Sequence, residues 1–151
     1  QPRYSLLSRE SEKLNRACLA HNIGVLSFGS LDGGILTGKH TKPPKFVEGD
    51  MRSNFYHFFQ EPRFSQCMKL IDVLREIADG HGKPISQVSI NWVAQQDFIT
   101  STLVGAKKPE QIRENSAAAD WELSTEELQK ISDAYDGIFG KFDSTYIHGQ
   151  R

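Results

Sequence analysis

Apolar residues recur along this chain in two rhythms, one typical of short buried strands and one typical of amphipathic helices. Apolar, β-branched runs at Ile23–Phe28 and Thr100–Val104 predict two buried strands. Apolar positions three and four residues apart predict helices over Arg9–His21, Phe64–His81, Pro84–Gln96 and Ser124–Tyr135. Helices alternating with short buried strands indicate an α/β fold with a parallel sheet.

Local signals mark the ends of several of these helices. Ser8 is a candidate N-cap for the first helix, whose expected buried stripe is formed by Leu14, Ala17, Cys18 and Leu19. Pro84 is expected to open its helix, and Ser124 and Glu127 have the spacing of a capping box. After the last helix, Asp136–Arg151 shows little periodicity.

The stretch Thr100–Asn115 combines a strand, a tight turn and the start of a helix. The strand ends at Gly105, two lysines follow, and Pro109 occupies a first-turn position of the helix. Unpaired backbone N–H groups at a helix start, together with a nearby lysine, suit a phosphate. The alternative is the solvated first turn of an ordinary αβ unit.

A glycine-rich segment, Gly29–Lys39, directly follows the first predicted strand. Its four glycines could bring backbone amides close to a diphosphate. It is not a P-loop, because the glycine-to-lysine spacing differs and no Ser or Thr follows Lys39. A merely flexible loop is the alternative.

The segment His40–Arg63 is long and without periodicity, with prolines early and aromatic residues later. Loops of this length in compact domains are usually functional or disordered. We expect a lid or binding wall, because exposed aromatic side chains need a surface to pack on, and a passive cover is the alternative.

Composition excludes several classes of function. A net charge of −1 and a pI near 6.6 give no case for a nucleic-acid partner or an anionic membrane. No apolar run approaches the roughly 20 residues of a membrane span, and we expect no signal peptide. Cys18 and Cys67 lack metal-ligand spacing, so we expect reduced thiols in a cytoplasmic protein.

Several stretches together resemble the C-terminal half of an aldo-keto reductase, a (β/α)8-barrel oxidoreductase that uses NADPH. The matching stretches occur in the family's order: Gln1–Leu7, Gly24–Leu31, Gly33–Lys39, Val104–Asn115 and Trp121–Ser124. The expected fold class is therefore α/β, the C-terminal portion of a TIM barrel, as one unit over residues 1–151. Because the chain starts at Gln1 without a methionine, we expect an excised or incomplete chain.

The resemblance implies a cofactor-binding role for a set of residues. Gln1 would bind the nicotinamide carboxamide, and Phe28 would stack on the nicotinamide ring. Backbone groups of Gly29, Leu31 and Gly33, with the side chains of Lys39 and Arg52, would meet the pyrophosphate. At the other end of the cofactor, the expected residues are Gly105, Lys107 beside the 2′-phosphate, Gln111, and Glu114 and Asn115 on the adenine.

The chain also departs from the family pattern. Family members commonly read Tyr-Ser-Pro-Leu where this chain has Phe28–Leu31. The family's catalytic Asp-Tyr-Lys-His set lies in the N-terminal half, so no catalytic residue is expected here. We considered Tyr56 and His57 as a substitute acid pair, but adjacent residues on a loop need not face one site.

The function implied for the intact protein is reduction of an aldehyde or ketone by hydride transfer from NADPH, with a tyrosine as proton donor. Two alternatives are a non-catalytic, cofactor-sensing subunit of the same fold and an unrelated phosphate-binding half-barrel. We expect this chain alone to be inactive. Its expected macromolecular partner is the N-terminal half of the barrel or a second copy of itself.

Overall fold

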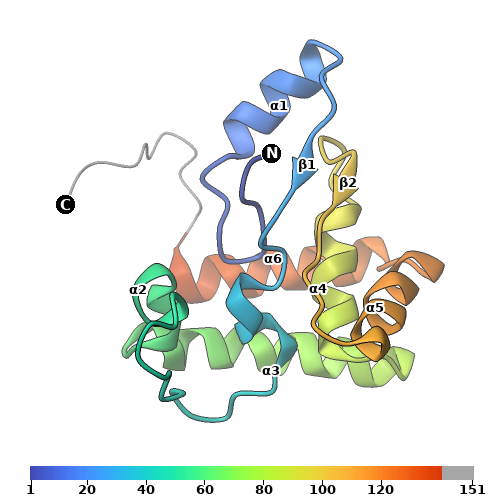
Figure 1. Ribbon diagram of the computed structural model, residues 1–151. Coiled ribbons are helices and arrows are strands. Elements are labelled where there is room, and N and C mark those ends of the chain that lie inside the picture. The colour runs from blue at the N-terminus through green and yellow to red at the C-terminus, as the bar shows by residue number, and fades with distance from the viewer. Residues whose placement is uncertain (141–151) are drawn as a thin grey trace.

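Three parallel chain segments lie side by side at the centre of the computed structural model, which describes residues 1–140 (Figure 1). Strand β1 (Leu26–Ser27) pairs in parallel with β2 (Ser101–Thr102), with Leu26 opposite Ser101. On the other side of β1, Arg3 forms a parallel bridge with Phe28. The predicted parallel arrangement is thus confirmed.

Both strands are shorter than the sequence predicts. Main-chain bonds still extend beyond them, since the Thr100 and Ser101 amides donate to the Val25 carbonyl at 2.9 and 3.2 Å. Among the described residues, Arg3 and β2 each have a neighbouring strand on one side only. A strand extends only as far as a neighbouring segment pairs with it, so β1 and β2 end where this short ladder ends.

The first helix differs most from its prediction. Helix α1 (Glu12–Ala20) begins with Ser11 at its N-cap, and the predicted cap Ser8 instead donates its hydroxyl to Asp32 at 3.0 Å. Three members of the predicted stripe are exposed, Leu14 at 59%, Leu19 at 46% and Ala17, while Asn15 is buried. The helix projects beyond the body of the molecule, so most of its apolar side chains have no layer to pack on (Figure 1).

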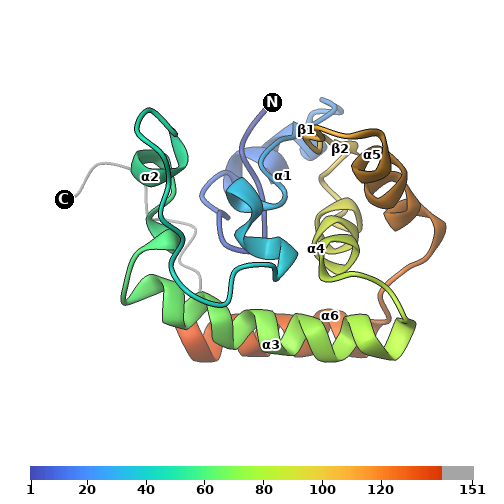
Figure 2. The ribbon, with the colours of Figure 1, turned by 60° about the horizontal axis from the view of Figure 1, so that its bottom comes forward.

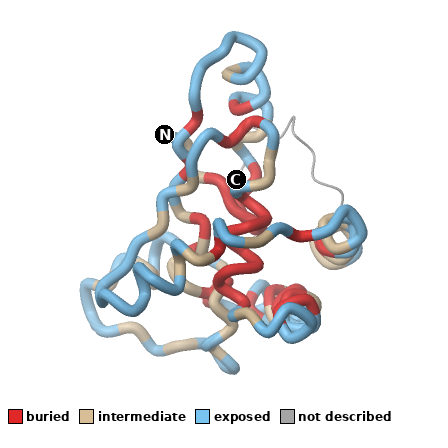
Figure 3. The backbone as a smooth tube through the Cα atoms, turned by 90° about the vertical axis from the view of Figure 1, so that its right-hand side faces the viewer, coloured by how far each residue is buried: buried red, intermediate tan, exposed pale blue. Residues whose placement is uncertain are grey.

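The core lies between the central segments and three helices. Helices α3 (Arg63–His81) and α6 (Thr125–Phe139) run side by side beneath α4 (Ile85–Ala94) (Figure 2). Buried chain concentrates in this central region (Figure 3), where every residue from 85 to 93 is buried. Trp92 is a core residue, with its ring stacked 5.8 Å from that of Tyr4.

Helix ends follow the sequence signals at α6 and differ from them at α4. The Ser124 hydroxyl accepts from the Glu127 amide at 3.2 Å, and the Glu127 carboxylate accepts from the Ser124 amide at 2.8 Å, which confirms the capping box. Pro84 is the N-cap of α4 rather than its first residue. Because α6 continues to Phe139, the predicted irregular tail begins later, and residues 141–151 lie outside the described chain.

The segments predicted to be irregular contain short helices. A 3-10 turn, η1 (Asp32–Thr37), lies within the glycine-rich segment, and α2 (Arg52–Phe55) and η2 (His57–Phe59) lie within His40–Arg63. Helix α5 (Pro109–Ser116) and η3 (Ala117–Asp120) follow β2. None of the helices in residues 1–140 is both long and apolar enough to cross a bilayer.

Candidate functional site

The two glycine-containing loops meet at one edge of the sheet. Because β1 and β2 are parallel neighbours, the chain leaves both strands on the same side. The Ser30 hydroxyl then donates to the Leu103 carbonyl at 3.5 Å, linking the two connections. The structure therefore brings together the loops that follow the two predicted strands.

The glycine-rich segment is closely packed rather than a flexible loop. Gly33 has a φ of 67°, and a Cβ there would lie 2.9 Å from the Tyr56 ring. A Cβ at Gly38, whose φ is 70°, would lie 2.4 Å from Ile85. These positions combine left-handed backbone with too little space for a side chain, so they require glycine.

Loop carbonyls are engaged in bonds that fix the shape of the segment. The Gly29 carbonyl accepts from the Asp32 amide at 2.8 Å, and the Leu31 carbonyl accepts from the Gly34 amide at 2.8 Å. The Thr37 hydroxyl donates to the Gly34 carbonyl at 2.7 Å. The curve of the loop is thus set before any ligand is bound.

Phe28 presents an aromatic ring at the end of β1. Its side chain is 41% exposed, whereas the neighbouring Ser27 is buried. Arg3 is opposite Phe28 on the neighbouring segment, so Gln1 lies two residues earlier, level with Leu26. Gln1 lines a shallow pocket of about 240 Å³ together with α1 residues such as Leu14.

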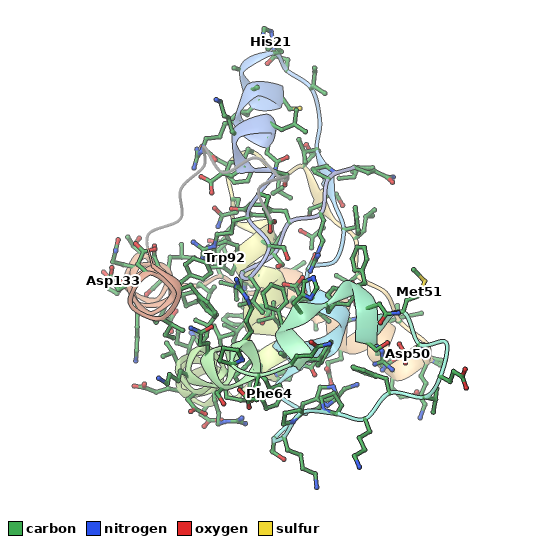
Figure 4. All side chains as sticks on the ribbon, turned by 90° about the vertical axis from the view of Figure 1, so that its left-hand side faces the viewer. His21, Asp50, Met51, Phe64, Trp92 and Asp133 are labelled. Carbon is green, nitrogen blue, oxygen red and sulfur yellow. The ribbon has the colours of Figure 1, made fainter. Side chains whose placement is uncertain are left out.

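The three cations predicted to meet the cofactor phosphates, Lys39, Arg52 and Lys107, lie near the glycine-rich segment or the long segment after it. The Lys39 ammonium lies 3.8 Å from where a Cβ would stand on Gly34. Arg52 holds Asp50 in a two-pronged pair, with Nη2 to Oδ2 at 2.6 Å and Nε to Oδ1 at 3.0 Å. Figure 4 shows Asp50 on the side of the molecule opposite Asp133 of α6.

Electrostatic effects show that these charges influence one another. Hydrogen bonds from Arg52, with a smaller contribution from the Lys107 ammonium, lower the pKa of Asp50 to about 2. Burial lowers the pKa of His40, and the charges of Lys39 and Arg52 act in the same direction. Asp50 and His40 therefore lie among the cations expected to meet phosphate groups.

The start of α5 is organised by Gln111. Its carboxamide oxygen accepts from the amides of Lys107 and Lys108 at 2.7 and 3.2 Å, which closes the turn. The Glu114 carboxylate accepts from the Ser86 hydroxyl of α4 at 2.9 Å. Asn115 lines a pocket of about 410 Å³ between α4, β2 and α5, and Gly105 lies exposed in the connection after β2.

Two residues that the sequence reasoning missed occupy the centre of this edge. Asp32 is completely buried and accepts bonds from Arg3 Nη2 at 2.5 Å, Ser8 Oγ at 3.0 Å and the Ser5 hydroxyl. Burial raises the pKa of Asp32, and Arg3 is the main opposing influence. Two features of the sequence could have identified these residues. Asp32 is the single acid within the glycine-rich segment, and Arg3 lies two residues after Gln1, which places both on one face of a strand.

The alternative acid pair does not form. The half-buried Tyr56 ring lies against Gly33 and 4.7 Å from the Arg3 guanidinium carbon, and burial raises its pKa. His57 is exposed on η2. The two side chains therefore occupy different surroundings, and the structure gives them no shared site.

Comparison with known proteins gives a consistent result. The family model described as "Aldo/keto reductase family" matches residues 1–136. The chain is 34% identical over 134 residues to Aldo-keto reductase YhdN of Bacillus subtilis, covering 87% of this chain and 40% of that protein. It is 30% identical over 136 residues to the L-glyceraldehyde 3-phosphate reductase of Escherichia coli O157:H7, covering 87% and 39%.

Two further similarities concern a channel subunit and a solved structure. A probable voltage-gated potassium channel subunit beta of Arabidopsis thaliana is 29% identical over 125 residues, covering 80% of this chain and 38% of that protein. The glycerol dehydrogenase AKR11B4 from Gluconobacter oxydans superimposes with a TM-score of 0.83 at 30% identity, over 97% of this chain and 44% of that one.

The chain spans about 40% of the length of the curated relatives it matches. The family match and the structural neighbour support an α/β-barrel fold, of which this structure forms a part. On these grounds the chain belongs to the aldo/keto reductase family.

Proposed function

We propose that this chain supplies the NADP(H)-binding edge of an oxidoreductase that reduces aldehydes or ketones to alcohols. The observation that carries the proposal is the grouping of Lys39, Arg52 and Lys107 beside a closely packed glycine-rich loop. Three cations and a helix N-terminus suit a ligand with several phosphate groups.

The residues fit the two ends of such a cofactor. Phe28 offers a partly exposed flat ring for the nicotinamide, and the turn from Lys107 into α5 offers a cation and a helix start for the 2′-phosphate. When bound, NADPH supplies a hydride to the carbonyl carbon. This chain's residues orient the cofactor, and its glycine-rich loop lets the backbone come close to the pyrophosphate.

The remaining chemistry is assigned to other parts of the whole protein. We infer that a tyrosine outside this chain donates the proton to the developing alkoxide. The rest of the barrel, or a second copy of this chain, would cover the exposed apolar side chains of Leu26 and Leu103. We place the protein in the cytoplasm, without a nucleic-acid or membrane partner.

A second candidate is a non-catalytic subunit of the same fold that senses bound cofactor. The similarity to a probable voltage-gated potassium channel subunit beta supports this second candidate. The two functions share the cofactor site and differ in turnover: the reductase oxidises NADPH when given an aldehyde, whereas a pure sensor binds NADPH without oxidising it.

Lys107→Glu in the full-length protein tests the cofactor assignment. A charge-assisted contact to a phosphate contributes on the order of 1.5–3 kcal/mol, so NADPH affinity should fall about 10- to 100-fold while NADH affinity changes little. Isothermal titration with both cofactors measures this difference. Lys13→Glu on α1 makes the same charge change away from the loop edge and should leave both affinities intact. Equal losses for NADPH and NADH in Lys107→Glu would show that Lys107 does not read the 2′-phosphate.

A further inference from the structure

Arg3 lies where three separate segments meet. Its backbone pairs with Phe28 at the end of β1, and its Cγ lies 3.2 Å from where a Cβ would stand on Gly29. Its guanidinium carbon lies 5.2 Å from the Phe55 ring centre and 4.7 Å from that of Tyr56. The Arg3 side chain therefore contacts the glycine-rich loop and the aromatic end of the long segment, while its backbone pairs with the end of β1.

The position of Arg3 is fixed by a buried carboxylate. Asp32 has no exposed surface and accepts two bonds from Arg3, from Nη2 at 2.5 Å and from Nε at 3.2 Å. The hydroxyls of Ser5 and Ser8 donate to the same carboxylate. Arg3 and the two hydroxyls oppose the burial that raises the pKa of Asp32, and the two bonds from Arg3 hold the planar guanidinium in one orientation.

The aromatic end of the long segment packs on this guanidinium. The exposed Phe55 ring and the half-buried Tyr56 ring both lie against Arg3. Gly33 leaves room for the Tyr56 ring, since a Cβ there would lie 2.9 Å from it. A cation between aromatic rings attracts their faces and so holds the segment against the strand ends.

We propose that Arg3, anchored by Asp32, is a positioning residue that fixes the Phe55–Tyr56 wall beside Phe28 at the nicotinamide half of the site. This inference rests on the proposed cofactor site. Because Arg3 forms a parallel bridge with Phe28, the wall it holds lies at the same strand end as the ring proposed to meet the nicotinamide. Arg3 acts through the aromatic side chains and need not contact the cofactor itself.

The test compares two ligands that share one end. NADPH has both a nicotinamide and a 2′-phosphoadenosine half, whereas adenosine 2′,5′-bisphosphate has only the latter. In the full-length protein, Arg3→Met should weaken NADPH binding about 10-fold, a typical effect for a displaced cation–aromatic contact, and leave binding of the bisphosphate unchanged. A general loss of structure would weaken both ligands.

Limited trypsin digestion gives a readout that does not depend on binding. Cleavage after Lys45 and Arg52 should become several-fold faster in Arg3→Met, because the segment carrying them loses its contact with Arg3. Arg16→Met is the matched control: Arg16 also pairs with a carboxylate, Glu12, and lies 4.8 Å from a ring, that of Phe98. It should change neither ligand affinity nor cleavage.

Companion variants separate positioning from misfolding. Arg3→Met leaves the Asp32 charge buried and unpaired, so the double variant Arg3→Met/Asp32→Asn removes that charge and should show the same ligand pattern. Arg3→Lys keeps a charge for Asp32 without the planar stack and should give intermediate cleavage.

The outcomes are distinct. The positioning role would be overturned if Arg3→Met and the double variant both bound NADPH with wild-type affinity and were both cleaved by trypsin at the wild-type rate. Equal loss of both ligands in the folded double variant would also overturn it. If the wild-type protein binds neither ligand, the proposed cofactor site is wrong, and trypsin cleavage alone then decides whether Arg3 holds the segment.

Discussion

The two cysteines differ in solvent exposure, and their thiols should therefore differ in reactivity. Cys67 is completely buried on α3, and burial raises the pKa of its thiol to about 12, whereas Cys18 on α1 is partly exposed. Since the thiolate is the reacting form, Cys67 should be inert at neutral pH. A chromogenic disulfide reagent should therefore titrate one thiol per native chain and two after unfolding in denaturant. Two fast-reacting thiols in the native protein would contradict the packing around α3.

The pair between Asp50 and Arg52 gives a prediction about pH. The pKa of Asp50, about 2, lies below the ordinary 3.8, so its contribution to loop order is present above pH 3.8 and is lost as the pH falls toward 2. Carboxyl carbon chemical shifts followed by NMR should show this late titration. Arg52→Met should return the pKa of Asp50 toward 3.8. A midpoint near 3.8 in the wild-type protein would mean that Arg52 does not hold Asp50 in solution.

At the scale of elements, the capping box of α6 is a local interaction with a measurable contribution. Ser124→Ala removes the hydroxyl that accepts from the Glu127 amide and should cost about 1 kcal/mol of unfolding free energy. For a chain of this length, that corresponds to roughly 2–4 °C in melting temperature. Thr125→Ala, one residue further into the helix, is the control and should have a smaller effect. Equal shifts for the two variants would argue against the cap.

Elements whose signals are local could be predicted from the sequence. The α6 cap, the α3 helix with its stop at the glycine after His81, and the start of α5 at Pro109 all depend on residues a few positions apart. The start of α1 could not be predicted in this way. Ser8 looked like a cap, but its hydroxyl binds Asp32, 24 residues away. The apolar stripe of α1 was misread as buried because periodicity identifies a face without saying what covers it.

The site was predictable to the extent that it follows strands and loops in order. The parallel pairing of β1 and β2 brings Gly29–Lys39 and Lys107–Asn115 to one edge, as expected for two neighbouring αβ units. Arg3, Asp32 and Asp50 were missed because each acts through a partner that only the fold or loop conformation brings near. The sequence indicated which residue types were present, whereas the pairing of charges depended on the fold.

At the scale of the whole molecule, the exposed apolar surface predicts association. Leu14 and Ile23 on one side, and Leu103 and Ile112 on the other, are 40–60% exposed. Open strand edges with apolar neighbours favour pairing with a further chain or segment. We therefore expect residues 1–151 alone to sediment as a dimer and to leave NADPH unoxidised in the presence of a reactive aldehyde. A folded monomer that reduces the aldehyde would contradict both expectations.

The central claim is that the segments Phe28–Gly38 and Lys107–Asn115 form one cofactor site. Hydrogen–deuterium exchange of the full-length protein, with and without NADPH, tests it most directly. We predict slower exchange in both segments on binding, and little change along α3 and α6, which lie beneath the site. Protection in only one of the two segments, or protection centred on the pocket between Gln1 and α1, would contradict the account.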